Sequence, residues 1–186
     1  MPSVAVFCGA REGRDPRYAA AARALGAALA ARGWTLVYGG GKVGLMGLLA
    51  QACLDAGGQV TGVIPGFLSS REVLHPGLQI SHQVDDLFER KALMLELADA
   101  FVALPGGIGT LDELLEVMAW RQLGCIDKPV ALLNTAGYFD PWLRTLDHAI
   151  AEQFVDGAER TRLLVADSLD ELLATLGTLL SAENEG

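Results

Sequence analysis

Short apolar runs alternate with longer amphipathic segments along this whole chain. The short runs lack the polar alternation of half-exposed strands, so they are typical of strands buried on both faces of a sheet. Strands separated by helix-length segments pair in parallel, because a parallel crossover needs a long connection. The pattern therefore predicts an α/β fold: a Rossmann-like, doubly wound parallel sheet of about six or seven strands in three layers, α-β-α.

The runs give approximate element boundaries. The expected strands are residues 4–8, 34–38, 60–64, 100–104, 129–133 and 163–166, with 79–84 as a short edge strand. The expected helices are residues 16–32, 44–56, 86–98, 108–123, 138–154 and 168–180, and residues 67–78 read as a loop. Without a linker or internal repeat, residues 1–180 are expected to form a single domain and residues 181–186 a flexible tail.

The composition excludes several functional classes. With 14 Lys and Arg against 23 Asp and Glu, the net charge of −9 argues against nucleic-acid or membrane-surface binding, which needs a basic face. No apolar run reaches the roughly 20 residues of a membrane span, and Ser3 begins a strand-like run without a preceding basic stretch, so no signal peptide is expected. Cys8, Cys53 and Cys125 are odd in number and lack metal-site spacing, which predicts no metal and a reducing, cytoplasmic setting.

Glycine-rich segments follow three of the expected strands, at residues 8–13, 39–47 and 105–110. Ligands of doubly wound sheets bind beyond the carboxyl ends of the strands. Glycine lets backbone N–H groups approach an anion, and a helix N-terminus adds unpaired donors and partial positive charge. Residues 106–110, where Thr110 adds a hydroxyl, therefore favour phosphate binding. Ordinary strand-to-helix turns are the alternative, but three on one sheet edge favour a nucleotide site.

Common nucleotide motifs match this chain poorly. Gly39, Gly41 and Gly44 fit the G-x-G-x-x-G spacing, but the next strand ends at residues 63–65 without the acid that binds ribose in NAD enzymes. A Walker loop needs serine or threonine where Val43 stands. The G-x-S-x-G elbow of serine hydrolases is absent. NAD, a Walker-type nucleotide site and a serine hydrolase are all disfavoured.

Two carboxylates follow the third glycine segment. Glu113 and Glu116 are three residues apart and share one helix face. The expected core face is Leu111, Leu114, Leu115 and Met118. Val117 and Trp120 are expected beside the glutamates on the other side, which suggests a subunit interface; Trp120 packed under a neighbouring helix is the alternative.

Two adjacent cations lie at the start of the helix before the fifth expected strand. Arg90 and Lys91 near a helix start are unfavourable to the helix dipole, unless an anion or carboxylate lies opposite. A solvated basic turn is the simpler alternative. Arg71 and Glu72, in the expected loop, could reach the same cleft.

At this point the sequence resembles a known family. Residues 105–113 are similar to the PGGxGTxxE signature of the LOG ("lonely guy") family, phosphoribohydrolases of cytokinin riboside 5′-monophosphates long described as lysine decarboxylases. Residues 7–9, 38–47, 63–65, 71–72, 89–94, 120–124 and 128–130 resemble further family segments in order, so the resemblance covers nearly the whole chain.

The resemblance implies a nucleotide-binding domain that hydrolyses the N-glycosidic bond of adenosine 5′-monophosphates, N6-modified or plain, to free base and ribose 5-phosphate. It implies Arg90 and Glu113 as catalytic residues, a nucleoside monophosphate as the small-molecule partner, a homodimer and no metal or organic cofactor. The implied substrate-binding residues are Gly39, Gly40, Gly41, Glu72, Lys91, Gly106, Gly107, Ile108, Gly109, Thr110, Leu111, Asp112 and Glu116.

The chain departs from the family pattern at four positions. Ala10 and Arg11 stand where serine is common, Phe88 where histidine is common, and Asp112 where glutamate is common. The first change removes a hydroxyl donor near the expected phosphate and adds a cation. These departures are expected to affect substrate choice more than reaction class.

Three other functions compete with this interpretation. A pyridoxal-phosphate lysine decarboxylase needs a Schiff-base lysine, and none of Lys42, Lys91 and Lys128 has a suitable setting. A non-catalytic nucleotide or molybdenum-cofactor carrier on the same fold is the main alternative. A transferase like the nucleoside 2-deoxyribosyltransferases would instead form a covalent glycosyl-enzyme.

Overall fold

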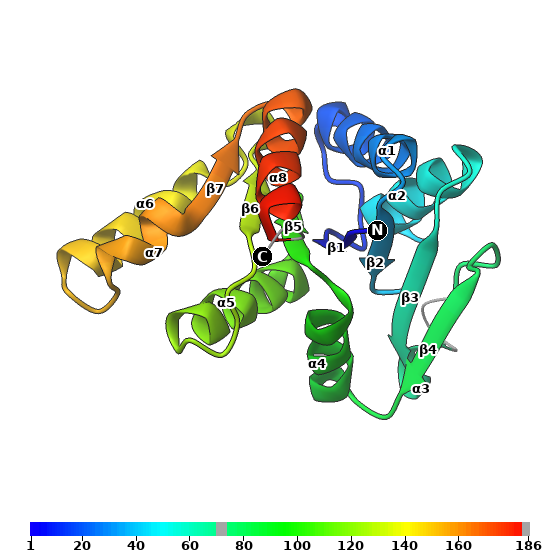
Figure 1. Ribbon diagram of the computed structural model, residues 1–186, viewed down its shortest axis with the longest axis horizontal. Coiled ribbons are helices and arrows are strands. Elements are labelled where there is room, and N and C mark those ends of the chain that lie inside the picture. Colours follow the sequence, from blue (N-terminus) through cyan, green and yellow to red (C-terminus); the bar gives the residue numbers. More distant parts are fainter. Residues whose placement is uncertain (70–73, 184–186) are drawn as a thin grey trace.

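The computed structural model describes residues 1–69 and 74–183. Its seven strands form one sheet in the order β4-β3-β2-β1-β5-β6-β7, and every neighbouring pair is parallel (Figure 1). The strands are β1 (Ser3–Phe7), β2 (Thr35–Tyr38), β3 (Val60–Pro65), β4 (Ile80–Val84), β5 (Ala100–Ala103), β6 (Val130–Leu133) and β7 (Leu163–Ala166). The predicted Rossmann-like α/β fold is confirmed, with β4 at the edge as expected.

Helices cover both faces of the sheet. One face is covered by α1 (Pro16–Ala31), α2 (Gly44–Asp55) and α8 (Leu169–Glu183), and the other by α4 (Leu87–Leu97), α5 (Ile108–Gln122) and α6 (Asp140–Ala151) (Figure 1). In β1 the side chains of Val4 and Val6 enter the first core, whereas Ala5 and Phe7 enter the second. This two-sided burial explains the continuous apolar runs.

The strand order reverses between β1 and β5. From β1 the chain proceeds outward through β2, β3 and β4, then returns to place β5 on the other side of β1. The loops after these two strands meet, because Gly9 N–H donates to the Pro105 carbonyl at 3.1 Å. A reversal of this kind leaves a crevice at the carboxyl ends of the strands. The crevice therefore lies beside two of the glycine-rich segments, residues 8–13 and 105–110.

The region around α6 differs from the prediction. Instead of one helix over residues 138–154, a 3-10 turn, η1 (Thr135–Gly137), precedes α6, and a short helix, α7 (Gly157–Arg162), follows it. Ala136, Gly137 and Gln153 have positive φ, which interrupts a helix on both sides. Asp156 accepts a hydrogen bond from Ala158 N–H and caps α7. The segment expected to be a loop also begins with a short helix, α3 (Gly66–Ser69).

The core face of α5 was predicted partly wrongly. Leu114 and Met118 are buried, but Leu115 is half exposed and Val117 is fully buried in the core. The buried positions Thr110, Leu114, Val117, Met118 and Arg121 form a regular helical stripe. Val117 is therefore unavailable for a subunit interface, while Trp120 remains partly exposed.

The last helix is longer than expected. Helix α8 continues to Glu183 and so includes the first half of the segment predicted as a flexible tail. Residues 184–186 lie outside the described part. Across residues 1–69 and 74–183, none of the helices has both the length and the apolar character needed to cross a bilayer.

Candidate active site

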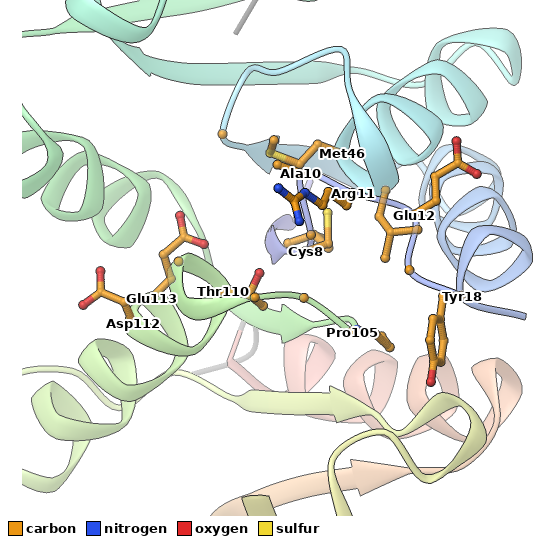
Figure 2. A pocket seen from close by; sticks show the side chains of 18 of the residues that line it. Cys8, Ala10, Arg11, Glu12, Tyr18, Met46, Pro105, Thr110, Asp112 and Glu113 are labelled. Carbon is orange, nitrogen blue, oxygen red and sulfur yellow. The ribbon is translucent and has the colours of Figure 1, made fainter. Parts of the chain in front are cut away.

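A cavity of about 460 Å³ lies at the carboxyl ends of β1 and β5. Its walls come from the β1–α1 loop, the start of α2, the start of α4, and the loop and first turns of α5. Figure 2 shows Asp112 and Glu113 at one end, Tyr18 at the other, and Thr110 between them. The three predicted glycine segments therefore meet at one cavity.

Several glycines in this wall are required by close packing. A Cβ on Gly106 would collide with the side chain of Thr110, and one on Gly39 would collide with the guanidinium of Arg90. A Cβ on Gly9 would approach the Gly106 Cα to 3.3 Å and the Arg11 carbonyl oxygen to 2.9 Å. At these positions glycine lets the loops and Arg90 pack together.

Two other glycines of this wall are not explained by close packing. A Cβ on Gly107 or Gly109 would meet no heavy atom within 4 Å. Gly107 caps α5 without a side-chain hydrogen bond, and the N–H groups of residues 107–110 have no acceptor in the described part of the chain. These donors, together with the positive end of the α5 dipole, form a surface that is suited to an anion.

An arginine–glutamate pair stands next to this surface. Arg90 on α4 places Nη2 3.3 Å from Oε1 of Glu113 on α5, and both side chains are nearly buried. The N-terminus of α4 is capped by Asp86, which accepts from Glu89 N–H at 2.8 Å, while Glu89 accepts from Asp85 N–H at 2.7 Å. Glu89 therefore fixes the turn that precedes α4, and Arg90 extends into the site.

Lys91 bridges two other carboxylates of α5. Its Nζ lies 3.2 Å from Oδ2 of Asp112 and also pairs with Glu116. Burial by itself would lower the pKa of Lys91, but the hydrogen bonds that its ammonium donates to Glu116 and Asp112 outweigh burial and raise the pKa. The carboxylates predicted opposite the two cations are confirmed. They keep Lys91 protonated, so that its ion pairs connect α4 to α5.

Cys8 lines the cavity but is a poor nucleophile. Burial, and secondarily the charge of Glu113, raise the pKa of its thiol, so the thiolate is disfavoured at neutral pH. The three cysteines are free thiols. In the described ranges no group of three His, Cys, Asp or Glu side chains is arranged to hold a metal ion. The polar groups at the cavity include the side chains of Arg90 and Glu113 and the amides at the start of α5.

The structure brings most of the predicted site residues together. The cavity is lined by Gly39, Arg90, Lys91, Gly106, Gly107, Gly109, Thr110, Asp112 and Glu113. Five predicted residues do not line it. Gly40 and Gly41 turn toward the Leu74 segment, Ile108 points outward and is 88% exposed, Leu111 packs against the core, and Glu116 acts through Lys91. Glu72 lies outside the described residues.

Comparison with known proteins identifies the family. A family model described as "Possible lysine decarboxylase" matches residues 46–176. The cytokinin riboside 5′-monophosphate phosphoribohydrolase of Rhodococcoides fascians is 48% identical over 175 residues, covering 94% of this chain and 88% of that protein. The enzyme of the same name, LOG, from Oryza sativa is 47% identical over 173 residues, covering 93% and 72%. The chain belongs to the LOG family.

A solved structure is similar to this LOG-family chain along almost its full length. The molybdenum cofactor binding protein of Rippkaea orientalis has a TM-score of 0.73 at 22% identity and covers 97% of this chain and 98% of its own. At that identity the similarity establishes the shared fold, and it leaves function to the site itself.

Sequence reasoning missed other cavity residues of this LOG-family chain. They are Tyr18, Leu87 and Tyr138. Glu12, Gly13 and Met46 also line the cavity and lie within the predicted glycine segments, but were not singled out as site residues. Leu87 lies two residues before the recognised segment 89–94, and Met46 belongs to the recognised segment 38–47, so both could have been inferred. Tyr138 had no local signal, because it reaches the cavity only through the turn before α6.

Proposed function

We propose that this protein hydrolyses the N-glycosidic bond of adenosine 5′-monophosphates, plain or N6-modified. The bond between C1′ and the base nitrogen breaks, and its electron pair leaves with the base. The oxygen of a water molecule bonds to C1′, and one water proton ends on the base. The products are the free base, a cytokinin or adenine, and ribose 5-phosphate.

One observation supports this function above the others. The Arg90–Glu113 pair, 3.3 Å apart, stands at the edge of an amide surface suited to a phosphate dianion, in a chain about half identical to named phosphoribohydrolases. Bond cleavage develops positive charge at C1′, which a nearby carboxylate stabilises. Glu113 stabilises this charge and orients water, and Arg90 steadies the ribose phosphate or the departing base.

The residues do not fit lysine decarboxylase chemistry. A pyridoxal enzyme needs a neutral, nucleophilic lysine in its cavity. Lys91, the lysine that lines the cavity, is paired with two carboxylates that raise its pKa. The ammonium of Lys128 donates to the Leu95 carbonyl at 2.8 Å, and Lys42 is exposed away from the cavity lining.

A carrier function is the second candidate, because molybdenum cofactor binding proteins share this fold. Chromatography of the protein incubated with AMP and with N6-isopentenyl-AMP separates the two. Free base together with ribose 5-phosphate supports the hydrolase, and the ratio of the two rates reports whether the N6 substituent matters. Intact nucleotides despite measurable binding would favour a carrier. A covalent sugar adduct on Glu113 would instead favour a glycosyl-transfer mechanism.

We also propose that the protein is a cytoplasmic homodimer. Leu115, Trp120 and Leu123 are at least partly exposed apolar side chains along and just beyond α5, and Phe88 on α4 is 76% exposed. Such a surface is suited to a second copy of the chain. A monomer in light scattering at micromolar concentration would contradict this. Free thiols at Cys8, Cys53 and Cys125 are compatible with a reducing compartment.

A further inference from the structure

The hydroxyl of Tyr138 donates a hydrogen bond to the carbonyl oxygen of Gly106. This bond joins the turn before α6 to the loop that begins α5, across 32 positions of sequence. Both residues line the cavity. Neither the signature segment nor the Arg90–Glu113 pair explains why a tyrosine is placed there.

The ring of Tyr138 is held on two sides. It makes edge-on contacts with Tyr18, at 5.6 Å between ring centroids, and with Phe139, at 5.1 Å. The chain reaches this position through Ala136 and Gly137, both with positive φ. A left-handed alanine is an uncommon conformation, which costs free energy and persists where the surroundings hold it. The tyrosine is therefore fixed in its orientation before any ligand binds.

The carbonyl that Tyr138 holds determines where the next amide points. The peptide between Gly106 and Gly107 is trans, so the Gly106 C=O and the Gly107 N–H point in opposite directions. Two glycines flank this peptide, and without side chains it could rotate easily. Because the carbonyl is held toward Tyr138, the Gly107 N–H faces away from that ring and has no acceptor among the described residues.

We propose that Tyr138 is a positioning residue that orients the Gly106–Gly107 peptide, so that the Gly107 N–H is a fixed donor to the substrate's phosphate. This inference rests on the proposed function for the placement of the phosphate. Pre-orientation removes the cost of ordering the loop on binding. Tyr138 therefore acts on the phosphate half of the nucleotide and leaves the base and the nucleoside sugar unaffected.

The test compares Tyr138→Phe with wild type in calorimetric titrations with ribose 5-phosphate and with adenosine. Phenylalanine keeps the ring and its edge contacts, so the variant is expected to fold, which thermal denaturation verifies. We expect ribose 5-phosphate to bind about tenfold more weakly, while adenosine binding is unchanged. In turnover of AMP, KM rises more than kcat falls.

Tyr38→Phe is the matched control. It removes the same atom from a buried tyrosine whose hydroxyl has no hydrogen-bond partner in the part of the chain that the structure describes, and which does not line the cavity. Its affinity for ribose 5-phosphate should equal that of wild type. A smaller, equal loss for both ligands in Tyr138→Phe would indicate a merely structural role and overturn the inference.

Two further outcomes separate this inference from the proposed function. A wild-type protein that binds ribose 5-phosphate but leaves AMP intact would contradict the hydrolase, and loss of that binding in Tyr138→Phe would still support the positioning role. Wild-type affinity for ribose 5-phosphate in Tyr138→Phe, or no binding by wild type itself, would overturn the positioning role.

Discussion

Two arginine–glutamate pairs use opposite ends of helix α5, and they differ in how completely they are bonded. Near its end, Arg121 donates to Oε2 of Glu159 through Nε at 3.2 Å and Nη2 at 2.9 Å, and through Nη1 to the Arg162 carbonyl at 3.2 Å. Near its start, Arg90 contacts Oε1 of Glu113 through Nη2 at 3.3 Å, and its buried Nε has no hydrogen-bond partner among residues 1–69 and 74–183.

The difference separates a pair that holds the fold from a pair that is available to a ligand. A buried charge is stable only when its hydrogen-bonding capacity is used. Arg121 meets this condition within the described protein, and the ends of α5 and α7 are joined by it. The Arg90 Nε lacks a hydrogen-bond partner within the same described ranges, and the cavity that Arg90 lines has room for one. This asymmetry supports the proposed functional role of the pair at the start of α5 and a structural role for the pair at its end.

The largest expected effect is on turnover at the start of α5. Glu113→Gln keeps the shape of the side chain but removes the charge that stabilises the positive centre at C1′. We expect kcat for AMP to fall by about 10³-fold in a protein that stays folded at the assay temperature, although loss of the Arg90 counter-charge lowers its melting temperature. Rates are measured by release of adenine, with Glu96→Gln on the exposed side of α4 as the control. Turnover near the wild-type rate would remove Glu113 from the mechanism.

The opposite outcome is expected at the end of α5. Glu159→Gln leaves the buried Arg121 charge without its counter-charge, which costs about 3–5 kcal/mol and lowers the melting temperature by about 10 °C. The kcat of the folded variant should stay close to wild type. Circular dichroism during heating measures the loss.

Asp147→Asn provides the comparison for this stability measurement, because its pair with Arg160 is solvent-exposed. Exposed pairs contribute about 1 kcal/mol or less. Equal losses in the two variants would show that Arg121–Glu159 is not special to the fold. A large loss of kcat in Glu159→Gln would show that the two ends of α5 are coupled.

The sequence predicts a carboxylate partner for Arg90 but gives no indication of the partner of Arg121. Arg90 and Lys91 violate the dipole preference of their helix, so carboxylates opposite them could be predicted. Arg121 lies at a helix C-terminus, where a cation is favourable, and nothing in its neighbourhood indicates that it is buried against Glu159. Glu159 lies 38 residues further along the chain, on α7, a helix that the sequence did not predict. The pair is therefore recognised only in the folded structure.

The same contrast applies to the fold. Seven parallel strands follow from apolar runs and helix-length crossovers, which are local patterns. The breaks around α6 depend on positive φ at Ala136 and Gln153, residue types that give no such signal. The cavity was predicted at its glycines, but Tyr18 and Tyr138 reach it through tertiary packing alone.

A third ion pair on α5 offers the smallest test. Lys91 pairs with Asp112 and Glu116, which together raise its pKa above the ordinary value of 10.5 despite burial, which acts the other way. A raised pKa in the folded state means that the stabilisation is fully present below about pH 10.5 and is lost as pH rises through the folded value. The difference in unfolding free energy between wild type and Lys91→Met should therefore be constant from neutral pH to about pH 10 and shrink above it.

Urea denaturation of both proteins at intervals from about pH 8 to pH 11.5 measures this difference. Lys42→Met, which removes an exposed ammonium without a carboxylate partner in the described ranges, should show no such trend. Lys91 is intermediate between the fully bonded Arg121–Glu159 pair and the Arg90–Glu113 pair. Its ammonium pairs with two carboxylates, yet the residue still lines the cavity. If its contribution persisted undiminished at the highest pH, packing of the lysine stem rather than charge would join α4 to α5. The Arg90–Glu113 pair would then be the main electrostatic contact between α4 and α5 at the cavity. A ligand whose groups replaced that pair would weaken the contact between the two helices.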